Sequence, residues 1–481
     1  MNNTENLDFL FHPGTIAIAG VSENINKFNA GLKFLESLIE FGFKGKIYPM
    51  NPTGGEVMGR KIYKSVKDIP DKIDFVISAI PAPYTPQLVA DAAQKGVRAI
   101  HFFTSGFSEI ENIEGKRLQA DIMARAKAGG IRVVGPNCLG LYCPSGGLSF
   151  NADFEKVSGP VAMIAQSGGN AAHCVHEGNG RGVFFSKVIS MGNGADLNES
   201  DYLEYLAQDD ETKIITAYIE GVKEGSRFFR ALKSATKSKP VIILKVGTSE
   251  SGAEAAVSHT TALAGSNQVW EGVLRQAGAI RAGSIEEMMD ITLAFQHMPA
   301  PKGNKIVIAG IGGGASVILA DEFSKAGLVL PRLGDKLRKS LIELYPSEAG
   351  RIFKNPVDLN NFESPEIFIK TMNALDQCEE ADLLAIHVAF DHFGLISIKD
   401  KEFVIGIYLK LIGQISREIK KPLAIILHSF TSAQTRKLAY DAGKELTAAG
   451  LTVFPSIQRA AMALSKFVHY HEKRRAAGWV K

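Results

Sequence analysis

The sequence lacks the features that mark membrane-spanning, secreted and nucleic-acid-binding proteins. No apolar run approaches the ~18 residues of a membrane-spanning helix, so we expect no contact with a membrane. Its 481 residues include only four cysteines, without paired disulfide spacing or a CxxC metal motif, which predicts free thiols in a reducing compartment. The net charge of +3 is too small and dispersed to predict nucleic-acid binding. The polar, acidic residues 1–8 do not resemble a signal peptide, so we expect a cytoplasmic protein.

Short apolar runs alternate with helix-length amphipathic segments, a pattern typical of βα units around parallel sheets. The clearest predicted strands are Thr15–Ala19, Lys46–Tyr48, Phe75–Ile80, Ala99–Phe103, Arg132–Val134, Val161–Ala165, Phe185–Ile189, Ile214–Ile219, Val241–Lys245, Lys305–Ala309, Leu383–His387 and Leu423–Leu427. The length predicts about three domains, and a proline-rich link at residues 298–303 sets off the last third. We therefore predict three open α/β domains, at residues 1–150, 151–300 and 301–481.

The turns after these strands argue against a dinucleotide cofactor. Gly20 follows the first predicted strand, but the second and third glycines of a G-x-G-x-x-G fingerprint are missing. The second strand leads to Asn51 without the acidic residue that would hold a ribose hydroxyl. Residues 310–315 match the fingerprint as a string, yet no acid ends the strand that follows. Hydride transfer with NAD is therefore a poor fit.

Two glycine-rich turns are better suited to a phosphate. Each directly follows a predicted strand and precedes a helical stretch, so its backbone could approach an anion at a helix N-terminus. Their residues are Gln166, Ser167, Gly168 and Gly169, and Gly312, Gly313 and Gly314. Each turn taken alone is equally compatible with an ordinary tight connection. Together with the histidine described next, they predict an anion-binding pocket.

His259 lies in a loop of small residues, Ala255–Gly265, after a Gly/Ser-rich approach. Its imidazole is either a transient phosphoryl carrier or a cap of the following helix. Glu220 ends the predicted strand Ile214–Ile219. Its carboxylate either accepts an N–H from such a histidine, which strengthens the other ring nitrogen as a nucleophile, or caps a turn. His173 and His176 have no further ligand nearby in sequence, so we predict no metal site.

The turns resemble, in order, those of the nucleoside-diphosphate-forming acyl-CoA synthetases. This family includes ADP-forming acetate–CoA ligase and, more distantly, the α subunit of succinyl-CoA synthetase. The motifs that carry the resemblance are Gly20–Asn24, Tyr48–Pro52, Thr104–Phe107, Gly135–Gly140, Gln166–Gly169, Ser190–Asn193, Tyr218–Gly221, Ser258–Gly265 and Asn355–Asp358. The resemblance implies a Rossmann-like CoA-binding domain followed by two flavodoxin-like domains.

The resemblance also implies a reaction in which acyl-CoA, phosphate and ADP give a carboxylate, coenzyme A (CoA) and ATP. His259 would carry the phosphoryl group, Glu220 would orient His259, and the two glycine turns would hold phosphate. The residues implied to bind CoA are Gly20, Val21, Ser22, Asn24, Lys27, Asn51, Pro81, Thr104, Ser105 and Asn137. No ATP-grasp or Walker pattern is recognisable. We therefore expect a separate ATP-grasp β subunit that binds ADP or ATP and Mg²⁺, in an α₂β₂ assembly acting on a small carboxylic acid.

Two positions depart from the pattern of the family. Thr261 stands where the phosphohistidine loop usually has glycine, and Gly169-Asn170-Ala171 replaces the usual continuation of the Gln-Ser-Gly turn. Threonine disfavours positive φ, so the histidine loop is either reshaped or gains a hydroxyl ligand. The alternative to an enzyme is a non-catalytic paralogue that binds CoA or acyl-CoA as a sensor or scaffold.

Overall fold

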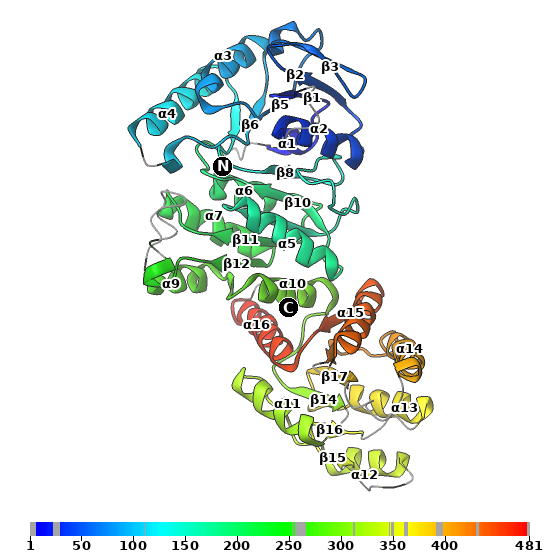
Figure 1. Ribbon diagram of the computed structural model, residues 1–481. Helices are drawn as coiled ribbons and strands as arrows, with labels where there is room; N and C mark the ends of the chain where they lie inside the picture. Colours follow the sequence, from blue (N-terminus) through cyan, green and yellow to red (C-terminus); the bar gives the residue numbers. More distant parts are fainter. Residues whose placement is uncertain are drawn as a thin grey trace. The chain divides into compact units, whose positions relative to one another are not determined.

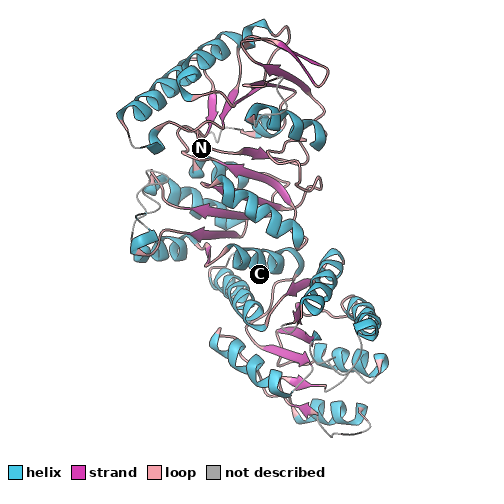
Figure 2. Cartoon of the chain, viewed as in Figure 1, coloured by secondary structure: helices cyan, strands magenta, loops and turns pink. Residues whose placement is uncertain are grey.

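The computed structural model describes residues 6–22, 29–110, 112–252, 254, 266–310, 313–345, 347, 351–359, 364–390, 398–429 and 432–478 (Figure 1). Residues 1–179 and 183–285 belong to one compact unit, and residues 180–182 and 286–481 to a second. In both units helices flank the strands of parallel sheets (Figure 2). A search of these residues finds no helix that is long and apolar enough to span a membrane.

The first sheet of the first unit has five parallel strands in the order β2-β1-β5-β6-β7. They are β1 (Thr15–Ala19), β2 (Lys46–Met50), β5 (Phe75–Ser78), β6 (Ala99–Phe102) and β7 (Arg132–Val134). The helices α2 (Ala30–Phe41), α3 (Thr85–Lys95) and α4 (Ile113–Ala128) connect them, and β3 (Gly55–Val57) pairs with β4 (Arg60–Ile62) as a separate hairpin. The order reverses between β1 and β5, and ligands of open α/β sheets bind outside the carboxyl ends of strands at such a switch point.

The second sheet of this unit has the order β13-β12-β11-β9-β10-β8. Its parallel strands are β9 (Val161–Ala165), β10 (Phe185–Ser190), β11 (Ile214–Ile219), β12 (Val241–Lys245) and β13 (Ile280–Ala282), and β8 (Gly140–Tyr142) pairs antiparallel with β10. The helices are α5 (Gly168–Gly180), α6 (Glu199–Leu206), α7 (Gly225–Ser238) and α9 (Asn267–Ala277). Here the switch point lies between β9 and β11.

The second unit repeats the arrangement, with the order β15-β16-β14-β17-β18-β19 and an antiparallel edge strand β15. The strands are β14 (Ile306–Gly310), β15 (Ile352–Phe353), β16 (Val357–Asp358), β17 (Leu383–Ala389), β18 (Leu423–His428) and β19 (Thr452–Phe454). The helices are α10 (Ile285–His297), α11 (Gly313–Lys325), α12 (Asp335–Leu344), α13 (Pro365–Asp376), α14 (Ile398–Ile415), α15 (Ala433–Ala448) and α16 (Ile457–Ala476). Fully buried Asp290 of α10 forms ion pairs with Arg181 and with Arg459 of α16.

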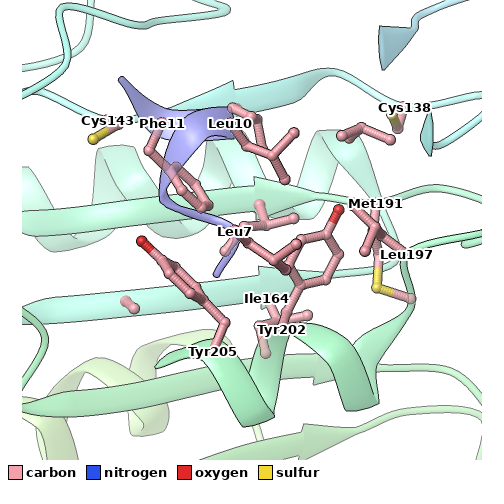
Figure 3. Close-up of a cluster of buried hydrophobic side chains, with 14 of the residues drawn as sticks. Leu7, Leu10, Phe11, Cys138, Cys143, Ile164, Met191, Leu197, Tyr202 and Tyr205 are labelled. Atoms are coloured by element: carbon pink, nitrogen blue, oxygen red, sulfur yellow. The ribbon is translucent and has the colours of Figure 1, made fainter. Parts of the chain in front are cut away.

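The short helix α1 (Asp8–Phe11) joins the two sheets of the first unit through one apolar core. Leu10 and Phe11 are fully buried and point toward Tyr202 and Tyr205 of α6 (Figure 3). The rings of Phe11 and Tyr205 stack with their centres 5.4 Å apart. Full burial of a large apolar side chain contributes roughly 1.5–3 kcal/mol. This core therefore fixes the two sheets that flank the site described below.

The α/β class with parallel sheets, predicted from the sequence, is confirmed. Several predicted strands end one or two residues away from the observed ends: the strand predicted to reach Ile80 ends at Ser78, and the one predicted to begin at Lys305 begins at Ile306. The four cysteines are buried and form no disulfide. The boundaries proposed for three domains stay a prediction.

Candidate active site

A cavity of about 490 Å³ lies in the first unit, beside the carboxyl ends of strands from both of its sheets. This volume is within the range of about 300–1,000 Å³ that is usual for small-molecule sites. Its lining residues follow β5, β6, β7, β9 and β10: Ala79, Ile80, Pro81, Phe103, Thr104, Ser105, Asn137, Cys138, Leu139, Gln166, Ser167, Gly168, Gly169, Gly192 and Asn193. The cavity thus gathers four of the predicted CoA-binding residues and all four residues of the first predicted phosphate turn.

The loop after β6 forms one side of this cavity and is held at both ends. The Thr104 hydroxyl donates to the backbone oxygen of Ile80 over 2.6 Å, and the Thr104 oxygen accepts the Asn137 N–H over 3.0 Å. At the other end, Glu109 accepts the N–H groups of Gly106 and Phe107. Ser105 lies exposed between these anchors.

The first predicted CoA-binding turn, which follows β1, packs closely against the backbone that follows β5. This contact lies at the switch point between the two strands. Gly20 has a φ of +95°, and a Cβ there would lie 2.7 Å from the Ala79 oxygen. Gly31 in the first turn of α2 approaches the same turn, since its Cβ would lie 2.6 Å from the Gly20 oxygen. Gly31 therefore provides the close helix–strand packing that a fingerprint glycine provides. Gly31 was not predicted from the sequence, because it lies too far along the chain from Gly20 for the fingerprint motif.

Not all predicted CoA residues reach the cavity. Val21 is buried, and Val21, Ser22 and Asn51 are not among the residues that line it. The Asn51 side chain instead accepts the N–H and hydroxyl of Thr53 within its own turn. The predicted residues Asn24 and Lys27 lie outside the described residues.

The phosphate turn after β9 opens α5, and glycine is required at its first helical residue. A Cβ on Gly168 would lie 2.7 Å from Cγ of Leu139, whereas a Cβ on Gly169 would have no heavy atom within 4 Å. The first N–H groups of a helix have no intrahelical partner and favour an anion. Because Ser167, Gly168 and Gly169 line the cavity, this helix end is suited to hold a phosphate there.

Gln166 connects the phosphate turn to Glu220 across the second switch point. Its side-chain oxygen accepts the N–H groups of Glu220 and Gly221, and its nitrogen donates to the Gly221 oxygen over 2.7 Å. Glu220 is 4% exposed. The Tyr218 hydroxyl hydrogen-bonds its carboxylate, and burial together with the Glu220 charge raises the pKa of Tyr218 to about 12. Tyr218 therefore stays protonated at neutral pH.

Lys245, at the end of β12, supports Glu220 from the other side. Its ammonium group donates to the Glu220 backbone oxygen over 2.8 Å and to the Val246 oxygen. Burial lowers the pKa of Lys245 to about 8, an effect opposed by the charge of Glu220. His259 lies outside the described residues, as does Thr261, so its pairing with Glu220 stays a prediction.

The second predicted phosphate turn belongs to the second unit. Gly313 and Gly314 open α11 after β14, and Gly312 lies outside the described residues. Gly310 approaches the adjacent strand so closely that its Cβ would lie 2.9 Å from that of His387. That this turn also holds phosphate stays a prediction.

Comparison with known proteins places the chain in a family. Residues 14–144 match a CoA binding domain, and residues 158–295 match a succinyl-CoA ligase like flavodoxin domain. The chain is 38% identical over 435 residues to the α subunit of ADP-forming acetate–CoA ligase II of Pyrococcus furiosus, a match that covers 90% of this chain and 92% of that one. It is 36% identical over 381 residues to ADP-forming acetate–CoA ligase I of Archaeoglobus fulgidus, covering 79% of this chain and 54% of that one.

A solved structure has the same fold over nearly the whole chain. Acetyl-coenzyme A synthetase 1 of Ca. Korarchaeum cryptofilum, solved in complex with phosphate and ADP, is 29% identical and superimposes with a TM-score of 0.84. The match covers 98% of this chain and 97% of that one. With the sequence matches, it shows that the chain belongs to the family of the ADP-forming acetate–CoA ligases and their α subunits.

Proposed function

We propose that this chain is the α subunit of an ADP-forming acyl-CoA synthetase. The enzyme interconverts acyl-CoA, phosphate and ADP with a carboxylate, CoA and ATP. The observation that carries the proposal is the cavity itself. In it the loop Thr104–Phe107 of the CoA-binding domain, held by hydrogen bonds at both ends, faces the N-terminus of α5, which is suited to phosphate. Both substrates of the first chemical step would meet there.

In the first step a phosphate oxygen attacks the thioester carbonyl, and the CoA thiolate leaves, which yields an acyl phosphate. The N-terminal N–H groups of α5, at Gly168 and Gly169, would stabilise the phosphate charge. In the second step a nitrogen of His259 attacks phosphorus, and the carboxylate leaves. Glu220 would accept the other ring N–H and stabilise the imidazolium that forms. The phosphohistidine then transfers its phosphoryl group to ADP.

The nucleotide step would take place on a partner. We propose an ATP-grasp β subunit that binds ADP or ATP with Mg²⁺, in an α₂β₂ assembly in the cytoplasm. Two observations support a partner: one relative is named as an α subunit, and the chain spans about half of another relative that is a single chain. By similarity to these relatives, the acyl group is acetyl or another small acyl group.

Measurement of intact mass at neutral to alkaline pH tests the proposal, because phosphohistidine is labile in acid. The full chain would be incubated with phosphate and a panel of acyl-CoAs, and separately with a co-expressed β subunit, ATP and Mg²⁺. We expect a gain of one phosphoryl group in the wild type and none in a His259→Ala variant.

The absence of any mass gain, with CoA binding intact, would refute phosphoryl transfer and favour the sensor or scaffold. A Thr261→Gly variant tests whether Thr261 is the reason for such an absence of mass gain. If only this variant is labelled, the histidine is a competent carrier that threonine holds in an unproductive loop.

A further inference from the structure

The turn after β10 reaches across the cavity from the second sheet and is fixed in place. Gly192 has a φ of +52°, and a Cβ there would lie 2.3 Å from the backbone oxygens of Pro136 and Asn137. The next residue, Asn193, donates its N–H to the Pro136 oxygen over 3.0 Å, and its own oxygen accepts Lys223 Nζ over 2.8 Å. The backbone of Asn193 is therefore held on both sides.

The side chain of Asn193 points from this turn to the CoA-binding domain. It is 5% exposed, and its Nδ2 donates to Oε2 of Glu109 over 2.6 Å and to Oε1 of Gln119 over 3.0 Å. The other carboxylate oxygen of Glu109 accepts the N–H groups of Gly106 over 2.6 Å and Phe107 over 3.1 Å. Hydrogen bonds to an ionised acceptor are short and roughly twice as strong as neutral ones.

These bonds define the geometry of the loop that carries Ser105. Its upstream end is tied through Thr104 to Ile80 and Asn137, and its downstream end is tied through Glu109 to Asn193. The turn of Asn193 follows β10, which lies beside β9 and its phosphate turn. A movement of Asn193 or loss of its bond would therefore change the distance between the loop and the phosphate turn.

We propose that Glu109 and Asn193 are a pair of positioning residues that hold the Thr104–Phe107 loop in the conformation that binds CoA. The inference rests on the proposed function, because it assumes that this loop contacts CoA. Neither residue takes part in the chemistry. Their bond joins the CoA-binding loop to the domain that binds phosphate. It therefore holds the thioester and the attacking phosphate in the relative position that the reaction requires.

An exchange of the two functional groups tests the pair. Asn193→Asp places a carboxylate against Glu109, so we expect CoA binding to weaken by about tenfold or more, the factor that a hydrogen bond to a charged group is worth. The double variant Asn193→Asp/Glu109→Gln restores one amide–carboxylate bond with reversed direction. The amide oxygen introduced at position 109 can still accept the N–H groups of Gly106 and Phe107. We therefore expect the double variant to recover most of the affinity.

The measurement is the Kd of the full chain for CoA by isothermal titration calorimetry, with thermal unfolding as a record of folding. Glu114→Gln is the matched control, because Glu114 is an exposed carboxylate in the first turn of α4. Normal CoA affinity in Asn193→Asp would overturn the inference. So would a double variant as weak as the single one, or a loss of affinity that only parallels a fall in unfolding temperature. A wild-type chain that binds no CoA would overturn the proposed function, and this inference with it.

Discussion

Replacing Lys245 with methionine is expected to remove a buried positive charge beside Glu220. Lys245 is 4% exposed, and its ammonium group donates to the Glu220 and Val246 backbone oxygens. The same Nζ lies 5.1 Å from the centre of the Trp270 ring. Methionine keeps an unbranched apolar stem in this space and carries no charge. The variant therefore tests the charge more than the packing.

The structure gives the sign and an upper magnitude of the effect. Burial lowers the pKa of Lys245 from 10.5 to about 8. Between these two pH values the unfolded chain holds a proton that the folded chain has lost, so the free energy of unfolding rises with pH. The buried charge of Lys245 destabilises the folded chain fully below pH 8 and no longer does so above pH 10.5. This lowering of the pKa corresponds to at most about 3 kcal/mol of free energy. Between pH 8 and pH 10.5, the free energy of unfolding of the wild type should therefore rise by up to this amount relative to that of Lys245→Met.

Two measurements check this prediction. The first is the fluorescence of Trp270 as a function of pH, in a Trp479→Phe background because the chain has only two tryptophans. We expect an inflection near pH 8 that is absent in Lys245→Met. The second is urea unfolding of both proteins at pH 7.5 and at pH 10. An inflection that persists in the variant, or a stability difference that does not change with pH, would refute the assignment of a titrating buried ammonium.

Three further substitutions have outcomes set by local geometry. Gly168→Ala places a Cβ 2.7 Å from Leu139, and such overpacking costs about 1–3 kcal/mol. We therefore expect a lower unfolding temperature and a smaller gain of phosphoryl groups in the intact-mass measurement. Gly169→Ala meets no atom within 4 Å and removes a helical glycine, which stabilises by about 0.5–1 kcal/mol; equal thermal unfolding of the two variants would contradict the packing argument. Asp290→Asn leaves two arginines facing a neutral amide and should destabilise the second unit by about 3–5 kcal/mol in urea unfolding, whereas a loss below about 1 kcal/mol would show that the ion pairs contribute little.

The central strands could be predicted from the sequence because they are buried on both faces. β9, β11 and β12 are buried at every residue and almost entirely apolar, and the ranges predicted for them are those observed. Most strands of two or three residues were missed, although β7 (Arg132–Val134) was predicted. β8 and β15 are antiparallel edge strands of two or three residues, too short for a periodic pattern, and they depend on pairing with a neighbour. Local sequence therefore identified the long buried strands, but not most of the short strands that depend on a neighbour.

The site was predictable only in part, for a related reason. Gln166 was singled out because it directly follows a strand, and the family resemblance implied Pro81 and Thr104; all three line the cavity. Glu109 and Asn193 are 84 residues apart, and no local spacing relates them. Side-chain hydrogen bonds of this kind are visible only after the strands are ordered.

Strand order also explains why the turns that matter come together in pairs. In each of the three sheets the first parallel strand lies between the second and the third, counted along the chain. The turns after the first and third strands therefore meet at one switch point, however long the intervening segment is. This is why Gln166 bonds the backbone of Glu220, 54 residues away, and why Gly20 lies against Ala79. Crossovers between parallel strands are almost always right-handed, so a prediction that assigns strand order as well as strand position would pair these turns from the sequence alone.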